Sequence, residues 1–509
     1  MSFRLVPTPI APVRLPEPPA KGGLAPELRA AFLPAVGSER LLARLADPSA
    51  LAVTTGQQPG LFGGPLYTIH KAMSAAALAT ELEVAWGRPV VPVFWLAGDD
   101  HDLAEAAGAA WLDEEGGLVR HVLRTRPPGA PLTPMFREPL GRDGAAAVGA
   151  LERTLRSGPH REAMVDWARR HWRPETTVAG AFATGIAELL APFGILCFDS
   201  TSAAAKRAMA PLLLEAAARA GELDAALAER ARTLRETGAD PGVAVGDGAA
   251  LVMLEGRDGR DRLVPEGADW TLRRSGERFD RRALEGVAAL DPARLSPNVL
   301  LRPVVERALL PTVAYVAGPG ELRYLPLAAP LYDRLGVSAQ RPIPRWSGLV
   351  VEAQADRVLA KFSASLEELM ADGVALERRV VRGDLPVAAR QALDTLRESS
   401  AREFGTLAGV AAEVDPTLVR SIEGLARRAD WAVERAERKL VAHLLRRRAV
   451  ELAQVGRART GLRPGGAPQE RVLGFPAFGA RHGGTLPAAV RDAARTSYAA
   501  ALEAAPARS

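Results

Sequence analysis

The sequence has little cysteine and no long apolar run. Cys197 is the one cysteine in 509 residues, which excludes an internal disulfide and a zinc site built from cysteine thiolates. It lies within an apolar run, which favours a buried small residue over a nucleophile. No run approaches the roughly 18 apolar residues of a membrane span, and the N-terminus lacks the continuous apolar core of a secretion signal. We therefore expect a cytoplasmic protein without a membrane partner.

Lysine is also scarce, and arginine supplies nearly all of the positive charge. The lysines among the 65 basic residues are Lys21, Lys71, Lys206, Lys361 and Lys439. The arginines are spread along the chain, usually beside acidic residues, and the net charge is only +5. This pattern gives no basic face of the kind that binds nucleic acid, so we expect no nucleic-acid partner.

The length and composition indicate a globular protein with more than one domain. An apolar fraction of 48% and a charged fraction of 25% are ordinary for a soluble protein, and 509 residues exceed one simple core. We expect an α/β core over residues 1–348, a helical domain over 349–460 and a tail over 461–509 that returns to the body.

Four short apolar runs predict the strands of the core, and they span residues 50–54, 89–97, 194–198 and 311–317. Near-continuous apolar strands separated by helical segments are typical of a parallel sheet covered on both faces. Ligands bind beyond the carboxyl ends of such strands. Three of the four runs end in polar, glycine-containing segments, which are therefore the candidates for chemistry.

Two poorly periodic stretches, about 103–160 and 220–300, are predicted to be insertions into the core. The second contains the charged, glycine-rich sequence EGRDGRDRLVPEG, residues 255–267, which is typical of a hairpin.

The character of the sequence changes from about residue 350. Apolar residues recur at helical spacing from Val351 to Leu369, and a heptad stripe flanked by Arg and Glu follows Asp415-Pro416. The GDLP segment at residues 383–386 separates the first helix from the next. We predict three long helices packed as an antiparallel coiled coil, through which the protein forms a homodimer.

A glycine-rich loop joins the first predicted strand to a helix. The segment TTGQQPGLFGGPLYTIHK, residues 54–71, contains four glycines. Glycines let backbone N–H groups approach an anion, and the helix start adds a favourable dipole. The sequence is neither a Walker A loop nor a G-x-G-x-x-G fingerprint. It predicts a phosphate site of another kind or, alternatively, a structural turn with a solvated histidine.

The second strand ends in GDDHD, residues 98–102. Three carboxylates and one imidazole within five residues can bind a divalent metal, an amino group or a sugar hydroxyl. The alternative is a helix N-cap cluster, since aspartate favours helix starts. Because a cap does not require three acids and a histidine, we predict a functional site.

The fourth strand ends in GPGELRY, residues 318–324. Its glycines permit close backbone approach, and Glu321 can hold a cation or a substrate amine. The alternative is an ordinary turn with Glu321 in the first turn of a helix. Nearby side chains suited to carboxylates or phosphates are Asn298, Arg302 and Arg345.

Together these segments resemble one family in order and spacing, the cysteine-adding enzymes of bacillithiol biosynthesis. The resemblance is carried by residues 54–71 and by VPVFWLAGDDHD, SPNVLLRPVVERALLPTVAYVAGPGELRYLP and PIPRWSGLVVE. The heptad region and the GGAPQER element after it also resemble that family. The helix start at TIHK is similar, in addition, to the nucleotidyl-transferase signature of class I aminoacyl-tRNA synthetases.

The resemblance implies a Rossmann-like parallel-sheet core with inserted connecting segments and a C-terminal helical coiled-coil domain used for dimerisation. The implied reaction is the last step of the pathway, in which the carboxyl of cysteine is joined to the amine of glucosaminyl-malate. Amide formation from a free carboxylate needs activation, so we expect ATP or another nucleotide as cosubstrate, with Mg²⁺ as a candidate ion.

Under this interpretation the catalytic residues are His70, Lys71, Asp99, Asp100 and His101. His70 and Lys71 would stabilise phosphate charge, and His101 would deprotonate the attacking amine. The expected nucleotide-binding residues are Gly56, Gly60, Gly63, Gly64, Thr68, Gly318 and Gly320. The expected substrate-binding residues are Gln57, Gln58, Tyr67, Asp102, Asn298, Arg302, Glu321, Tyr324 and Arg345.

The chain departs from class I synthetases in two respects. Their second lysine signature has no counterpart, because the lysines after Lys206 fall in predicted coiled-coil helices. A cysteine-selecting zinc site of thiolate ligands cannot be built from one cysteine, so no zinc is expected.

Two other functions are compatible with the same motifs. The fold could ligate another amino acid or acceptor, because the motifs do not encode the thiol. It could also be a non-catalytic nucleotide-binding scaffold that recruits partners through the coiled coil. Clustered carboxylates in a cleft are costly to desolvate and disfavour the scaffold.

Overall fold

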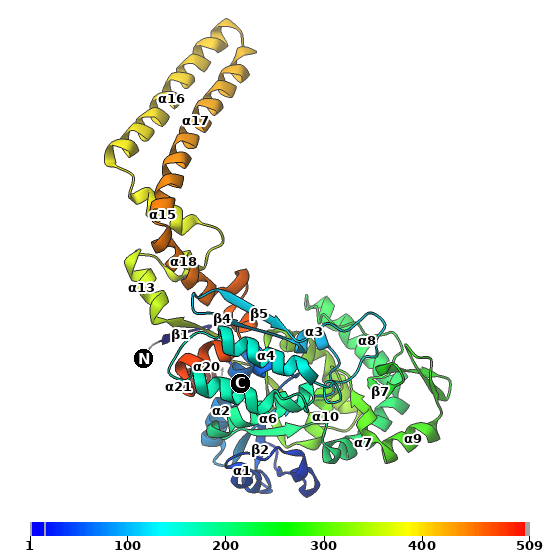
Figure 1. The fold of residues 1–509 in the computed structure, drawn as a ribbon. Helices are drawn as coiled ribbons and strands as arrows, with labels where there is room; N and C mark the ends of the chain where they lie inside the picture. Colours follow the sequence, from blue (N-terminus) through cyan, green and yellow to red (C-terminus); the bar gives the residue numbers. More distant parts are fainter. Residues whose placement is uncertain (1–2, 15–16, 504–509) are drawn as a thin grey trace. The chain divides into compact units, whose positions relative to one another are not determined.

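The computed structural model describes residues 3–14 and 17–503 and divides into two compact units (Figure 1). One unit contains Leu5–Val350 together with the chain from Pro468 onward, and the other contains Val351–Ala467. The expected combination of an α/β core and a helical C-terminal domain is confirmed. Within the described ranges, no helix is long and apolar enough to cross a membrane.

A five-stranded parallel sheet lies at the centre of the first unit. Its order is β13 (Arg341–Pro344), β12 (Thr312–Ala317), β2 (Leu51–Gln57), β3 (Val90–Leu96) and β6 (Leu196–Asp199). The four predicted strands are confirmed. The fifth, β13, was not predicted because its sequence is RPIP, and proline is tolerated in sheets chiefly on edge strands such as this one.

Helices cover the sheet and complete the first unit. Helix α2 (Tyr67–Trp86) follows β2 and packs against α21 (Thr485–Glu503). Its many alanines allow close approach, so α2 is buried along most of its length. The other helices that follow strands include α7 (Ala203–Ala218), α10 (Arg302–Leu309), α11 (Pro319–Tyr324) and α12 (Ala329–Arg334).

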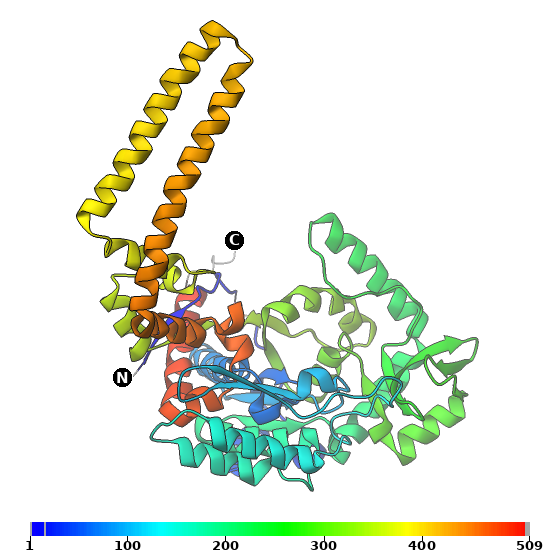
Figure 2. The same cartoon turned by 45° about the horizontal axis from the view of Figure 1, so that its top comes forward.

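The first predicted insertion begins with a short helix, α3 (Leu103–Ala106), and an antiparallel hairpin of β4 (Gly108–Leu112) and β5 (Leu118–Val122). Helices α4 (Gly141–Thr154), α5 (Arg161–His171) and α6 (Val178–Leu190) follow it. Figure 2 shows the hairpin and these helices in cyan and green-blue.

The second predicted insertion contains α8 (Ala220–Glu236), α9 (Arg281–Leu290) and a five-stranded antiparallel sheet. The sheet order is β10 (Arg278–Phe279), β9 (Asp269–Leu272), β8 (Gly259–Glu266), β7 (Val252–Gly256) and β11 (Leu295–Pro297). Strands β7 and β8 form the predicted hairpin.

The C-terminal segment belongs to the first unit through α19 (Gln469–Val472), α20 (Pro476–His482) and α21. The N–H of Leu66 donates to the carbonyl of Leu473, and the N–H of Gly474 donates to that of Ala110 at 2.9 Å. These bonds fix the segment between the glycine loop and the β4–β5 hairpin.

The second unit contains α13 (Ala353–Lys361), α14 (Leu366–Met370), α15 (Ala375–Gly383), α16 (Val387–Val414), α17 (Leu418–Arg447) and α18 (Ala449–Leu462). Helices α16 and α17 run side by side as the coiled coil (Figure 2). The prediction of three long helices holds for these two and is wrong for the first. Positive φ angles at Ser363 (44°) and Gly373 (82°) interrupt the helical path there and leave short helices.

Candidate functional site

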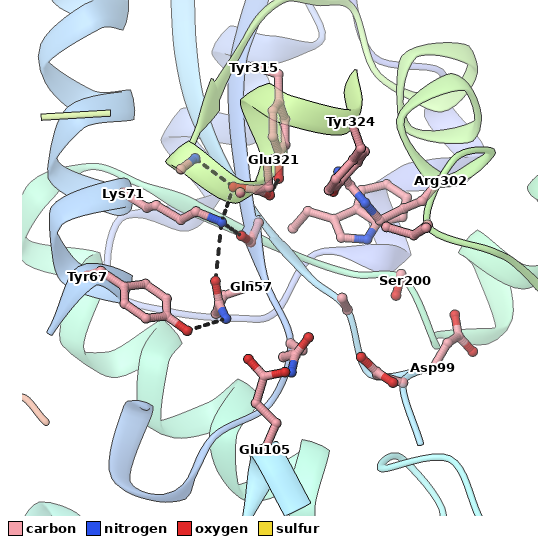
Figure 3. A pocket seen from close by; sticks show the side chains of 18 of the residues that line it. Gln57, Tyr67, Lys71, Asp99, Glu105, Ser200, Arg302, Tyr315, Glu321 and Tyr324 are labelled. Carbon is pink, nitrogen blue, oxygen red and sulfur yellow. Dashed lines mark hydrogen bonds and ion pairs between the residues drawn. The ribbon is translucent and has the colours of Figure 1, made fainter. Parts of the chain in front are cut away.

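A cavity of about 560 Å³ lies at the carboxyl ends of β2, β3 and β12, where the sequence predicts the site. Many of the predicted residues line it: Gly56, Gln57, Gln58, Tyr67, Lys71, Asp99, Asp100, Asn298, Arg302, Gly318, Gly320, Glu321, Tyr324 and Arg345. The other predicted residues, which do not line this cavity, are Gly60, Gly63, Gly64, Thr68, His70, His101 and Asp102. Figure 3 shows the cavity from close by.

Lys71 and Glu321 form an ion pair at one wall of the cavity, with 2.6 Å between Nζ and Oε2 (Figure 3). The Lys71 ammonium also donates to the carbonyl of Gly56 at 2.8 Å and to Oε1 of Gln57 at 3.2 Å. Glu321 accepts hydrogen bonds from the N–H of Gly318 at 2.7 Å and from the hydroxyl of Tyr315 at 2.6 Å. The glycine loop and the GPGE turn are thus joined through one lysine.

Burial and charge act in opposite directions on this pair. Burial lowers the pKa of Lys71, and the charge of Glu321 partly offsets that effect. Burial raises the pKa of Glu321, but the positive charges of Lys71 and Arg302 outweigh it and hold the pKa below its ordinary value. Glu321 is therefore ionised near neutral pH.

Arg302 enters the cavity from the first turn of α10. Its Nη1 donates to Oε2 of Glu306 at 2.7 Å, and its guanidinium lies over the ring of Tyr315, 4.9 Å from the centroid. Glu306 is fully buried and also accepts from the hydroxyl of Thr54. This network holds the Arg302 guanidinium against the ring of Tyr315, whose hydroxyl donates to Glu321.

Tyr67 and Gln57 form the side of the cavity nearest the glycine loop. The Gln57 amide donates to the Tyr67 hydroxyl at 3.2 Å. Burial raises the pKa of Tyr67 to about 12, so the phenol stays protonated and can donate to a ligand.

A second buried lysine, Lys206, was not predicted as a site residue. It is fully buried on the first turn of α7, and its ammonium donates to Oδ1 of Asp99 and to the carbonyl of Leu295. Burial lowers its pKa, while Asp99 favours the charged form. The signal in the sequence was its position eight residues after a predicted strand, at the start of the next helix, where helix starts face the ligand side of a parallel sheet.

The other members of the GDDHD segment largely shape the backbone. One oxygen of Asp100 accepts the N–H groups of His101 and Asp102, and Asp102 caps α3 by accepting the N–H of Glu105 at 3.2 Å. Only Asp99 and Asp100 of this segment line the cavity. Asp102 therefore acts as a helix cap, as the alternative interpretation states, whereas Asp99 and Asp100 lie at the cavity, as the site interpretation requires.

Arg260, from β8 of the second insertion, lines the cavity and was not predicted. It donates from Nε to Ser296 at 2.9 Å and from Nη2 to the carbonyl of Pro297 at 2.8 Å. Its Nη1 lies 3.2 Å from Nδ1 of His101, so His101 faces Arg260. Burial lowers the pKa of His101, and the charge of Arg260 adds to that effect.

His70 is fully buried on α2 and does not line the cavity. Its Nδ1 lies 2.8 Å from Oε2 of Glu470, and its ring meets that of Trp346 edge-on at 5.0 Å. Nε2 has no hydrogen-bond partner among the described residues. Burial lowers the pKa of His70. The histidine is therefore neutral and contacts the cavity only through other residues.

Glu470 connects His70 to the cavity-lining Arg345. Both oxygens of Glu470 accept from the Arg345 guanidinium, one of them at 2.9 Å from Nη1. Burial would raise the pKa of Glu470, but the bonds from His70 and Arg345 bring it to about 2. Glu470 lies in the GGAPQER element but was not predicted as a site residue, because spacing rules do not show that it meets Arg345, which is 125 residues away.

The remaining predicted residues have structural contacts. Asn298 accepts the N–H groups of Leu300 and Leu301 at 3.0 Å, which fixes the turn before α10. Gly63 packs toward Trp167 and Ile186. The hydroxyl of Thr68 is buried without a hydrogen-bond partner among the described residues. Gly60 and Gly64 line a second, smaller cavity beside the first.

Comparison with protein families gives two adjacent matches. Residues 34–346 match the N-terminal Rossmann-like domain described for bacillithiol biosynthesis BshC, and residues 348–492 match the C-terminal coiled-coil domain of the same description. The boundary between the two matches, at residues 346–348, lies within four residues of the boundary between the compact units at Val350.

Similar proteins are found in several bacteria, each named "Putative cysteine ligase BshC". The relative from Solibacter usitatus is 32% identical over 92% of this chain and 87% of its own length. The relative from Koribacter versatilis is 32% identical over 88% of this chain and 82% of its own. A relative from Thermus thermophilus is 33% identical over 86% of this chain and 84% of its own.

Proposed function

Because the chain belongs to the bacillithiol biosynthesis BshC family, we propose that it is the ligase that adds L-cysteine to the amine of glucosaminyl-malate. This is proposed as the last step of bacillithiol biosynthesis, with ATP, or another nucleotide, activating the cysteine carboxylate. The protein is an enzyme of the ligase class, as the names of its relatives indicate.

The observation that carries the proposal is a pair of buried lysine–carboxylate contacts facing one cavity. Lys71 pairs with Glu321 beyond β12, and Lys206 pairs with Asp99 beyond β3. Removing four charged groups from water costs free energy. That cost is offset only where the charges bind a ligand or pair with each other in very good geometry. A nucleotide-binding scaffold without chemistry would not need two such pairs.

The residues can meet the requirements of amide formation from a free carboxylate. ATP supplies a leaving group to the cysteine carboxyl, and the glucosamine nitrogen then displaces that group as it loses a proton. Lys71 supplies positive charge near the place where phosphate charge develops. Glu321, Asp99 and Asp100 offer carboxylates that can orient the ammonium of cysteine or the attacking amine.

The cavity offers groups that could hold a nucleotide and a metal ion. At Gly60 and Gly64 the backbone of the glycine loop lines the neighbouring cavity with no side chain in the way, so a phosphate can approach it closely. Asp99 and Asp100 are the carboxylates that would hold Mg²⁺, an ion that prefers oxygen ligands and would neutralise phosphate charge. Lys206 keeps Asp99 in place by binding its Oδ1, which leaves Oδ2 toward other partners.

We also propose a homodimer formed through the coiled coil and a cytoplasmic location, where ATP is available. The support for the dimer is the apolar surface of α16 and α17. Exposed apolar side chains on these helices include Leu396, Leu407, Val410, Leu418, Leu425 and Trp431. Scattered exposed apolar residues are ordinary, but this many on two helices favour burial against a second copy.

The test is a product assay with purified full-length protein, cysteine, glucosaminyl-malate and Mg-ATP, read by mass spectrometry. We expect bacillithiol, and its release with AMP would assign an adenylate route, whereas ADP would assign an acyl-phosphate route. Serine in place of cysteine is the matched control and should give far less product. Equal ligation of serine, or no product from folded enzyme and intact substrates, would contradict the proposed substrates.

A further inference from the structure

A second cavity, of about 350 Å³, adjoins the first on the side of the glycine loop. The two cavities share lining residues, among them Tyr67, Glu105 and Arg471. The rest of the second wall comes from the glycine loop and from the β4–β5 hairpin. A ligand bound at the strand ends can therefore extend into the second cavity without leaving the protein surface.

The basic residues of the two cavities differ in whether they are paired. In the first cavity Lys71, Arg302 and Arg345 each have an acidic partner, and Arg260 donates hydrogen bonds to Ser296 and to the carbonyl of Pro297. In the part of the chain that the structure describes, the side chains of Arg471 and Arg120 form neither an ion pair nor a hydrogen bond. Arg471 lies where the cavities meet, and Arg120 lines the second one. Their positive charge is available to a ligand.

The two arginines are carried by backbone segments that are bonded together. Arg120 on β5 is opposite Ala110 on β4, and the carbonyl of Ala110 accepts the N–H of Gly474. Arg471 precedes Gly474 by three residues in the segment that is also bonded to the glycine loop through Leu473. Both guanidinium groups therefore start from fixed positions beside the same cavity.

The rest of the second cavity suits an anion. Gly60 and Gly64 form a part of the wall that carries no side chains, and Gly64 has a φ of +74° that favours glycine. A Cβ at Gly60 would lie 2.8 Å from the Cα of Gly64, so the close approach requires glycine. The one carboxylate among the lining residues is Glu105, and burial raises its pKa.

We propose that Arg120 and Arg471 form a subsite for a multiply charged oxyanion of a substrate. Guanidinium groups bind two oxygens of a carboxylate or phosphate at once, and two of them suit a dianion. The identity of the substrate rests on the proposed function, in which two groups have this chemistry: the phosphates of ATP and the malate carboxylates of the acceptor. The subsite places one of them beside the glycine loop while the reacting carboxyl lies at the strand ends.

The experiment measures binding of Mg-ATP and of glucosaminyl-malate separately, by calorimetry on the full-length protein. The variants are Arg120→Ala, Arg471→Ala, the double variant and Arg471→Lys. The matched control is Arg282→Ala, because Arg282 is an exposed arginine of α9 that lines neither cavity. Both cavity arginines are exposed, so their replacement should leave the fold intact.

We expect each alanine variant to weaken one of the two ligands about tenfold, the double variant to weaken it further, and Arg471→Lys to lose less. Weaker ATP binding assigns the subsite to phosphate, and weaker acceptor binding assigns it to the dicarboxylate. Unchanged affinity for both ligands in the double variant would overturn the subsite. Binding does not require turnover, so a subsite that is confirmed while no bacillithiol is formed would refute the proposed reaction alone.

Discussion

The ammonium of Lys206 donates a hydrogen bond to Oδ1 of Asp99 inside the core of the first unit. The same ammonium donates to the carbonyl of Leu295. Lys206 on α7 therefore joins the end of β3 to β11 of the second insertion. Asp99 and the Lys71–Glu321 pair lie on different sides of the cavity (Figure 3). The cavity thus has an anchored carboxylate on each side.

Replacing Lys206 with methionine should destabilise the protein. Removal of one partner from a buried ion pair leaves an uncompensated charge and costs about 3–5 kcal/mol. The double variant Lys206→Met/Asp99→Asn should recover much of that loss, because neither partner is then left charged and alone. Urea unfolding of the two variants checks this, and wild-type stability of the single variant would show that the pair does not hold Asp99.

The contact between His70 and Glu470 predicts that these residues act as a unit on Arg345. The variants His70→Ala and Glu470→Gln should each lower turnover, and the double variant should lose little more than the more severe single one. Steady-state kinetics of the three variants tests this. Multiplicative losses would instead support the direct phosphate contact that the sequence suggested for His70.

The low pKa of Glu470 predicts an acid-dependent contribution to stability. The folded value is about 2 and the ordinary value is 4.5, so the stabilisation is complete above pH 4.5 and is lost as the pH falls toward 2. The buried, neutral His70 adds a loss of the same sign below its ordinary value of 6.5. The difference in thermal midpoint between the wild type and Glu470→Gln should therefore shrink between pH 7 and pH 3. A constant difference would contradict the ion pair.

The coiled coil predicts a homodimer of twice the 53.9 kDa chain mass. Replacing Leu425 and Trp431, both exposed on α17, with glutamate should yield a monomer of unchanged helicity, because charge opposes burial at an apolar interface. Multi-angle light scattering with circular dichroism measures both properties. A wild-type protein that is monomeric at micromolar concentration would remove the basis of this prediction.

Sequence reasoning located the strand ends but could not orient the helices behind them. His70 and Lys71 are neighbours on α2, and successive helical side chains point about 100° apart, so only one of them can face the cavity. Because α2 is buried nearly all round, its apolar pattern does not reveal which one. The structure places Lys71 in the cavity and His70 on Glu470.

The residues that were missed come from segments far away in sequence. Arg260 belongs to the second predicted insertion, and Glu470 and Arg471 belong to the tail. Spacing rules apply within one element and do not predict which distant segment closes a cavity. Lys206 is nearer to a predicted strand, but its burial against Asp99 depends on packing that the sequence alone does not show.

The most direct test of the central claim compares bacillithiol formation by the wild type and by the double variant Lys71→Met/Glu321→Gln. Removing both partners avoids a lone buried charge, so the variant should fold while losing the positive charge at the cavity wall. With cysteine, glucosaminyl-malate and Mg-ATP, we predict product from the wild type and a loss of about 100-fold or more in the variant. Undiminished product formation by the variant would show that the chemistry takes place elsewhere.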